Sequence, residues 1–307
     1  MKSVAILLST YNGERFLLEQ LDTLLNQKGV EAEVFVRDDG SSDGTRQILT
    51  EYAENNPTVH LDFAENVGVG NSFMNLLYSV PDGFDFYAFA DQDDIWEENK
   101  LAEAIRFLEE KGGLLYASNQ ECVDKEGKSI GLRYKSDEDI HLTPVSILQE
   151  NMIAGCTMVI TNGFYKILTQ ENRRPTAELL RNRIHDVWLA VTASLFEGII
   201  YDERSFIKYR QHENNVVGAN KAGFVKKLKS KIKKLFHSEH RNGRSMLAQE
   251  LFYKFPEEVN NFPLIEISAK AKKFKYKRKL LKNQKQLRLY SGESRLGFFI
   301  KVLFGWY

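Results

Sequence analysis

Three carboxylates follow a short apolar run in the sequence. Residues 84–90 are mostly apolar and lead into Asp91, Gln92, Asp93 and Asp94. Carboxylates at this spacing repel one another, and a strand that ends in them gains little unless a cation neutralises the charge. Mg²⁺ and Mn²⁺ take carboxylate oxygens and often share their shell with substrate phosphates. The stretch therefore predicts a divalent-cation site. The alternative is a solvated acidic turn, and in both interpretations we expect Asp94 to start the next helix.

The elements before this stretch alternate between strand and helix patterns. We predict strands at residues 4–8, 31–36, 59–63 and 84–90, of which the first and last are apolar runs. The segments between them have one apolar face, as helices do. This alternation indicates an α/β fold with βαβ units and a mostly parallel sheet. Ligands of such sheets bind at the carboxyl ends of the strands.

All four predicted strands end in polar, glycine-rich or acidic residues. The endings are residues 10–12, 38–39, 66–71 and 91–94. Because parallel strands bring their carboxyl ends to one edge of a sheet, we expect these residues to form a single rim.

The later part of the chain is less regular. We predict a buried strand over residues 153–160, a helix over 184–196, and two separate strands at 199–201 and 206–212. The last of these alternates apolar and polar residues, which is typical of an edge or half-exposed strand.

The 307 residues carry 42 basic and 42 acidic side chains, but the charge is unevenly distributed. Residues 1–220 carry 20 Lys and Arg against 36 Asp and Glu, whereas residues 221–307 carry 22 against 6. The basic part contains amphipathic helical patterns at 226–236 and 270–285 and ends in an apolar stretch at 297–307. It predicts peripheral binding to an anionic membrane surface. The alternatives are packing on the rest of the chain and a homodimer interface. We expect no nucleic-acid partner, because the first part is strongly acidic and lacks a recognition motif.

Composition places few further limits on the protein. Hydrophobic residues make up 43% of the chain, an ordinary value for a globular protein. The two cysteines, Cys122 and Cys156, are too few for a disulfide framework. The run at residues 4–8 is too short for a signal peptide, and no run approaches the roughly 20 residues of a membrane span. We therefore expect a cytoplasmic protein.

The ordered strand-end motifs resemble those of family-two glycosyltransferases. They are Ser9–Gly13, Asp38–Gly44, Asn66–Gly68 and Asp91–Asp94. Over about residues 3–220, the resemblance implies the GT-A fold: a Rossmann-like sheet flanked by helices.

This family fold implies a division of the chain. Residues 1–220 would form the catalytic domain, with a nucleotide-binding part at about 1–97 and an acceptor part at about 98–220. Residues 221–307 would form a C-terminal basic α-helical extension. Asp91–Trp96 together with His185–Trp188 most resembles bacterial rhamnosyltransferases of polysaccharide and O-antigen assembly.

The resemblance also implies residues that bind the nucleotide sugar. Thr10 and Tyr11 would offer main-chain groups and a stacking surface to the base. Asp39, with Asp38 beside it, would accept the N3–H of a pyrimidine. Gly68 would let the backbone approach the nucleotide. The full set is Thr10, Tyr11, Asn12, Asp38, Asp39, Asn66, Gly68, Asp91, Gln92 and Arg210.

Metal and catalytic roles follow from the same resemblance. Asp93 would be the direct ligand of Mg²⁺ or Mn²⁺, and Asp91 would contact ribose or sugar, either directly or through the metal. His212 would reach the metal or the diphosphate; the alternative is an exposed histidine at a strand end. Asp186 would be the base that deprotonates the acceptor, and Glu203 is a second candidate. The alternative for Asp186 is a first-turn acid favoured by the helix dipole.

The expected reaction is an inverting, metal-dependent sugar transfer. The first donor is dTDP-rhamnose and the second a UDP-hexose; the acceptor is a lipid-linked oligosaccharide or surface polysaccharide at the cytoplasmic face of the inner membrane. The Gln-x-x-Arg-Trp pattern of processive synthases is absent after Gln211, so we expect one sugar per encounter. The alternatives are a sugar nucleotidyltransferase and a non-catalytic nucleotide-sugar-binding protein.

Overall fold

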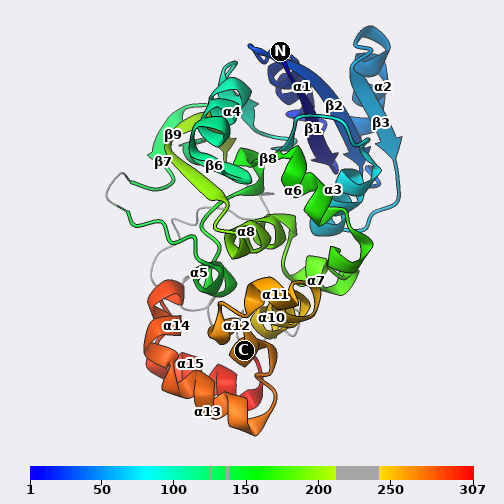
Figure 1. Ribbon diagram of the computed structural model, residues 1–307. Coiled ribbons are helices and arrows are strands. Elements are labelled where there is room, and N and C mark those ends of the chain that lie inside the picture. Colours follow the sequence, from blue (N-terminus) through cyan, green and yellow to red (C-terminus); the bar gives the residue numbers. More distant parts are fainter. Residues whose placement is uncertain (125, 136–137, 212–241) are drawn as a thin grey trace. The chain divides into compact units, whose positions relative to one another are not determined.

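The chain divides into two compact units. A computed structural model describes residues 1–124, 126–135, 138–211 and 242–307 (Figure 1). The first unit comprises Met1–Ile140, Ile153–Arg174 and Glu197–His212, and the second comprises His141–Met152, Pro175–Phe196 and Glu213–Tyr307. The second unit therefore takes segments from the middle of the chain as well as its end. A functional boundary at residue 220 stays a prediction.

The first unit is built on a mixed, nine-stranded sheet, counted over the described residues. Its order is β3-β2-β1-β4-β8-β6-β9-β5, and β7 pairs with β6. β1 pairs in parallel with β2 and β4, β2 with β3, and β6 with β9, whereas the other pairs are antiparallel. The strands are β1 (Lys2–Thr10), β2 (Val30–Asp38), β3 (Val59–Phe63), β4 (Phe86–Asp91), β5 (Ile95–Trp96), β6 (Leu115–Val123), β7 (Ser129–Leu132), β8 (Val159–Thr161) and β9 (Ile199–Arg210).

Helices join the parallel strands and complete the expected α/β arrangement. Residues 4–8 of β1 are fully buried, as a strand covered on both faces must be. The apolar face of the following helix, Leu17, Leu21 and Leu24, is also fully buried in the same core. The helices of this unit are α1 (Leu17–Leu25), α2 (Thr45–Asn55), α3 (Val69–Ser79), α4 (Lys100–Lys111) and α6 (Asn162–Leu168).

Two strand predictions were wrong in detail. Within 153–160, a 3₁₀ turn at Gly155–Thr157 precedes the short strand β8. The two strands expected at 199–201 and 206–212 are one strand, β9, which pairs with both β6 and β5. The polar residues 202–205 suggested a break between two strands. In the structure Asp202 is buried there and accepts hydrogen bonds from Tyr116 Oη at 3.2 Å and Arg204 Nη2 at 2.8 Å.

The described residues of the second unit form helices joined by loops, which confirms the helical character expected of the C-terminal region. Trp188 of α8 is fully buried and packs against Phe255, with ring centroids 6.0 Å apart. The basic stretch at 226–236 lies outside the described residues. The helices are α5 (Pro144–Gln149), α7 (Ala177–Asn182), α8 (His185–Leu195), α10 (Gly243–Lys254), α11 (Pro256–Val259), α12 (Pro263–Ala269), α13 (Phe274–Lys282), α14 (Gln284–Ser291) and α15 (Arg295–Phe304).

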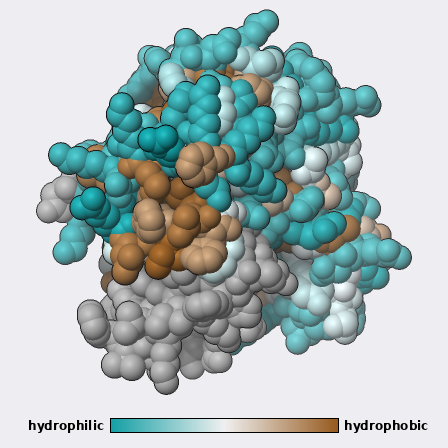
Figure 2. All heavy atoms as spheres, turned by 90° about the horizontal axis from the view of Figure 1, so that it is seen from below, coloured by the Kyte–Doolittle hydropathy of each residue, from teal (hydrophilic) through white to brown (hydrophobic). Residues whose placement is uncertain are grey.

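The helices α13 to α15 keep apolar side chains on both their inner and outer faces. Leu280, Phe298 and Val302 belong to a buried cluster, while Leu296 and Leu303 remain exposed. Figure 2 views the molecule from below and shows an apolar area among hydrophilic side chains. Of the helices in the described parts of the chain, none has the length and apolar character needed to cross a bilayer.

A partly buried ion cluster holds the second unit together and gives it a pH-dependent stability. Glu293 pairs with Arg244 at 3.1 Å and with Lys301. Burial by itself would raise the pKa of Glu293, but the two cations outweigh it and hold the pKa below its usual value. The ionised carboxylate therefore stabilises the fold at any pH above the unfolded pKa of about 4.3, and this stabilisation is lost as the pH falls through the lower folded pKa.

We expect Glu293→Gln to lower the free energy of unfolding by about 2 kcal/mol at pH 7, because it leaves two cations without their carboxylate. The difference from the unchanged protein should shrink as the pH falls below the unfolded pKa of about 4.3 towards the lower folded pKa, because the wild-type carboxylate then takes up a proton on unfolding. Denaturant unfolding at pH 7 and pH 3.5 measures both values. Glu257→Gln, at an exposed first-turn position of α11, is the control. A loss for Glu293→Gln that is equal at both pH values would contradict the ion-cluster explanation.

Candidate active site

The carboxyl ends of β1, β2 and β4 meet at one edge of the sheet, as predicted. The parallel register sets Thr10 beside Asp38 and Ser9 beside Asp91. The N–H of Asp39 continues the pairing by donating to the Thr10 carbonyl at 2.8 Å. The polar residues that follow three separate strands are therefore neighbours in space.

The side chain of Gln92 links the ends of β1 and β4. Its Oε1 accepts from Thr10 Oγ1 at 2.6 Å and from the Tyr11 N–H at 2.8 Å, and its Nε2 donates to the Tyr11 carbonyl at 3.1 Å. A Cβ at Gly13 would lie 2.4 Å from Gln92 Oε1, so a larger residue there would push the Gln92 amide out of these hydrogen bonds. The amide thus joins the two strand ends, while the Tyr11 side chain remains 49% exposed beside them.

Asn12 and Asp38 hold the loop after β2. Asn12 has a left-handed backbone with φ of 49°, and its Oδ1 accepts from the Ser42 N–H at 2.8 Å. Asp38 is fully buried and accepts from the Ser41 N–H at 3.1 Å and from Arg46 Nε at 2.6 Å. These bonds hold the Asp38 carboxylate against the loop and α2, and its contact with the nucleotide stays a prediction.

Asp39 connects the second and third loops of the rim. It is 3% exposed, and its carboxylate accepts from the N–H groups of Val67 and Gly68, each at 3.0 Å. Gly68 has φ of +84° at the start of α3, a conformation that favours glycine. The backbone N–H of Asn66 lies 3.0 Å from the position that a Cβ of Gly40 would take, so the two loops are in close contact.

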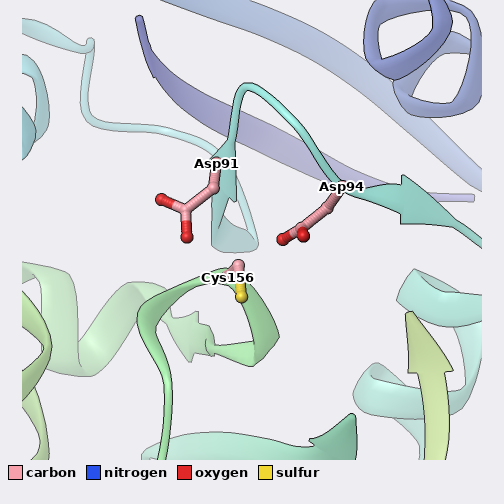
Figure 3. A group of neighbouring side chains, drawn as sticks. All are labelled: Asp91, Asp94 and Cys156. Carbon is pink, nitrogen blue, oxygen red and sulfur yellow. The ribbon is translucent and has the colours of Figure 1, made fainter. Parts of the chain in front are cut away.

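The acidic turn after β4 brings two carboxylates and a thiol together. One ligand atom from each of Asp91, Asp94 and Cys156 lies within 4.8 Å of the others. Figure 3 shows Asp91 and Asp94 on either side of the turn, with Cys156 coming from a different segment of the chain. The expectation that Asp94 starts the next helix was wrong: β5 follows it, and α4 begins only at Lys100.

Asp94 is as deeply buried as Cys156 and more deeply buried than Asp91. Its side chain is 1% exposed, and within the described part of the chain its Oδ2 has no hydrogen-bond partner. Burial, together with the nearby Asp93 and Asp91 carboxylates, raises its pKa well above the usual value. Burial likewise raises the pKa of the Cys156 thiol.

A buried lysine lies close to the acidic turn. Lys100 is fully buried, its Nζ lies 3.6 Å from the ring centroid of Trp96, and burial lowers its pKa to about 7 against the attraction of Cys156 and Asp94. Lys100 is the first residue of α4. Its burial could not be predicted from the sequence, because a lysine at a helix start is usually exposed.

These residues fit a hard divalent cation. Asp91 and Asp94 supply carboxylate oxygens, and the unsatisfied Oδ2 of Asp94 is an acceptor that a cation would complete. A buried, protonated thiol is a poor ligand for Mg²⁺ or Mn²⁺, so the two carboxylates, rather than Cys156, account for the fit. Asp93 is half-buried on the same turn.

Arg210 supports the turn from the end of β9. It is 4% exposed, and its guanidinium donates to the Asp93 carbonyl at 3.2 Å and to Glu19 Oε2 at 2.7 Å. Its N–H lies 3.4 Å from Asp94 Oδ1. Arg210 therefore connects the acidic turn to α1. His212, predicted to reach the metal or the diphosphate, lies outside the described residues.

Asp186 lies in the second unit, on the first turn of α8. Its Oδ1 accepts from the Val187 N–H at 2.6 Å. The neighbouring His185 is buried, and burial lowers its pKa to about 3, so its ring is neutral at physiological pH. Glu203, the second candidate base, is an exposed residue of β9 in the first unit.

Comparison with known proteins identifies the family. Residues 5–171 match the profile of glycosyl transferase family 2. The chain belongs to this family. The transferase is 31% identical over 222 residues to the dTDP-rhamnosyl transferase RfbG of Shigella flexneri, covering 69% of this chain and 74% of that protein. It is 25% identical to the putative teichuronic acid biosynthesis glycosyltransferase TuaG of Bacillus subtilis, over 73% of this chain and 84% of that one.

Solved structures share the fold of the transferase. S. aureus TarS 1–349 in complex with UDP-GlcNAc superposes with a TM-score of 0.54 at 17% identity, covering 99% of this chain and 91% of that chain. TarS 1–349 in complex with UDP gives a TM-score of 0.55. These similarities show an α/β fold like that of TarS. The activity follows from the family instead: the protein is a nucleotide-sugar-dependent glycosyltransferase.

Helix α1 holds the acidic turn through three polar side chains. Gln20 is fully buried and its Nε2 donates to the Asp91 carbonyl at 2.9 Å. Thr23 Oγ1 accepts from the Trp96 N–H at 3.2 Å, and Gln27 Nε2 donates to the Glu97 carbonyl at 2.9 Å. These contacts were not predicted, since Gln20, Thr23 and Gln27 look in the sequence like the polar face of an amphipathic helix.

We expect Gln20→Met to raise the Mn²⁺ concentration needed for half-maximal transfer by about tenfold, because the Asp91 backbone loses the bond that positions it. Titration of transfer with Mn²⁺ measures this value. Gln47→Met, on the exposed face of α2, is the matched control. A Gln20→Met protein that is less stable but has an unchanged Mn²⁺ requirement would show that the bond serves the fold alone.

Proposed function

We propose that this transferase moves a sugar, with inversion, from a nucleoside-diphosphate sugar bound along the rim of the first unit. The rim is the observation that carries the proposal, because it joins three strand ends and an acidic turn whose carboxylates fit a cation. dTDP-rhamnose is the first donor, in keeping with the name of the S. flexneri relative. A UDP-hexose is the second, because TarS was solved with UDP-GlcNAc.

The nucleotide is proposed to lie against the first three loops. The exposed ring of Tyr11 offers a surface on which a base stacks. The Asp39 carboxylate, held by the N–H groups of Val67 and Gly68, keeps acceptor capacity for a pyrimidine N3–H. Thr10, Asn12, Asp38 and Gln92 would act by fixing these loops, because their side chains bond to one another's loops, to the loop after β2 and to Arg46 of α2.

The diphosphate is proposed to lie at the acidic turn. A divalent cation bound there, by Asp93 and Asp91 with Asp94 beneath them, would stabilise the charge of the departing nucleoside diphosphate. Arg210 would keep the turn in place through Asp93, and its positive charge would favour the same anion. His212 is proposed as a further group directed to the metal or diphosphate.

The acceptor hydroxyl is proposed to lose its proton to Asp186. Asp186 lies on the first turn of α8, and its carboxylate would act as the general base. Attack on the face opposite the leaving group inverts the anomeric carbon. We propose a lipid-linked oligosaccharide or surface polysaccharide as acceptor, one sugar per encounter, and peripheral placement at the cytoplasmic face of the inner membrane.

A donor screen tests this proposal. The purified chain is incubated with Mn²⁺ and one of dTDP-rhamnose, UDP-glucose, UDP-GlcNAc or GDP-mannose, and thermal stabilisation and release of nucleoside diphosphate are measured. We expect dTDP-rhamnose to give the largest values of both. If only a UDP-sugar stabilises the protein, the proposed donor is a UDP-hexose and not dTDP-rhamnose. A donor that binds without Mn²⁺-dependent release of diphosphate would contradict the metal-dependent reaction.

A further inference from the structure

The outer surface of α13, α14 and α15 combines exposed apolar side chains with unpaired positive charge, and we refer to it as the α13–α15 face. Its six large apolar residues are between 43% and 76% exposed. They are Phe274, Leu289, Leu296, Phe299, Leu303 and Phe304.

Helix α15 shows that the exposure is organised. Phe298 and Val302 point into the buried cluster and are at most 1% exposed. Leu296, Phe299 and Leu303 are spaced by three and four residues, so they share the opposite face of the same helix. A helix that already buries one apolar stripe has no need of a second for its own packing, so this outer stripe indicates a partner.

The charge on the same helices has one sign. Residues 270–307 contain twelve Lys and Arg but a single acid, Glu293. Glu293 forms ion pairs with Arg244 and Lys301. Across the described chain, no carboxylate pairs with seven of the basic side chains, which are Lys272, Lys273, Lys275, Arg278, Lys282, Lys285 and Arg295.

The three helices are held together, so the face is a surface and not three separate segments. Lys277 of α13 donates to the Leu303 carbonyl of α15 at 2.7 Å. Leu280, Leu287 and Phe298, one from each helix, are fully buried in the same cluster.

We propose that the α13–α15 face binds the surface of an anionic lipid bilayer, with Leu296, Phe299 and Leu303 inserted among the acyl chains and the basic side chains on the lipid phosphates. Exposed apolar residues flanked by Lys and Arg are what an interfacial helix requires. The proposal deepens the proposed function, since it assigns the surface that would bring the enzyme to a lipid-linked acceptor.

Two other occupants fit less well. A second copy of the chain would place one strongly basic face against another, and like charges across an interface are unfavourable. A nucleic acid would match the charge but leave the aliphatic stripe of α15 without a partner, because phosphate contacts come from Lys, Arg and polar groups.

Vesicle flotation of the full chain tests the proposal without donor or acceptor, so its result is independent of whether transfer takes place. The vesicles are pure phosphatidylcholine, or phosphatidylcholine with 30% phosphatidylglycerol. We expect binding to the anionic vesicles only, and its loss in high salt. The triple variant Leu296→Gln, Phe299→Gln, Leu303→Gln should reduce the bound fraction about fivefold, although its net charge is unchanged.

A second variant and a matched control separate insertion from charge. Lys273→Gln, Lys275→Gln and Arg278→Gln together should also reduce binding about fivefold. Leu18→Gln with Tyr253→Gln removes apolar residues that are 54% and 77% exposed elsewhere, and should bind like the unchanged protein. Unfolding midpoints confirm that each variant is folded.

The proposal is overturned if the triple apolar variant keeps half or more of the wild-type bound fraction. It is also overturned if the unchanged protein binds neutral vesicles as well as anionic ones. The same holds if it binds no vesicles and instead forms dimers or retains a 30-nucleotide RNA. A loss of vesicle binding in the variants with normal transfer to a soluble acceptor would support the membrane surface independently of the reaction.

Discussion

Replacing Asp93 by alanine is expected to lower the rate of sugar transfer by about 10²–10³-fold while the protein stays folded. Asp93 is the proposed ligand that places positive charge against the leaving diphosphate, and removing one such electrostatic group costs this much in other enzymes. The fold should persist because Arg210 contacts the Asp93 carbonyl, which alanine retains. Donor-dependent product formation, with the unfolding midpoint measured alongside, checks both parts.

Companion variants decide which carboxylate carries the metal. Asp91→Asn and Asp94→Asn each remove one carboxylate of the buried group, and Glu98→Ala removes an exposed acid nearby whose partner is the surface residue Lys28. We expect Glu98→Ala to be normal. If Asp93→Ala transfers sugar within threefold of the wild-type rate while Asp91→Asn and Asp94→Asn are inactive, the direct ligands are Asp91 and Asp94, and the assignment of Asp93 is wrong.

Asp186→Asn is expected to lower the rate of transfer by about 10²–10⁴-fold, the range that a general base contributes. Asparagine keeps a side-chain oxygen that can accept from the Val187 N–H, so α8 should remain formed. The pH profile of transfer should lose the part of its acidic limb that protonation of this base causes. Donor binding, measured by thermal stabilisation with Mn²⁺, should be unchanged.

The control for Asp186 is an equivalent acid with no proposed role. Glu178 is also a first-turn acid of a helix in the second unit, on α7. Glu178→Gln should lose no more than a few tenths of a kcal/mol of stability and should transfer sugar normally. Near-normal transfer by Asp186→Asn would discard the base assignment and leave Glu203 as the next candidate.

Local sequence patterns were enough to predict the first four strands, the rim at their carboxyl ends and the family. A parallel strand that is covered on both faces is apolar along its length, so residues 4–8 and 86–90 stand out without knowledge of their partners. The residues after such strands are polar because they leave the core, and their order along the chain is the family's signature. Local patterns suffice wherever burial and periodicity act within one element.

The structure of the acidic turn could not be predicted, because it depends on contacts between distant parts of the chain. Asp94 looked like the start of a helix, since a short acidic sequence is the same at a helix N-terminus and in a buried turn. Its burial depends on Cys156, 62 positions later, and on Lys100, whose charge gives no sign that it lies inside. Gln20 and Arg210 meet the turn from α1 and β9, and contacts at this sequence separation leave no periodic trace.

The same reason explains the C-terminal helices. Their charge and amphipathic spacing were visible in the sequence, and they are helical as predicted. Which apolar residues face the core was not visible, because α15 is apolar on both sides. Packing against α13 and α14 decided that Phe298 and Val302 are buried and that Leu296, Phe299 and Leu303 remain outside, since a helix can turn only one side to its neighbours.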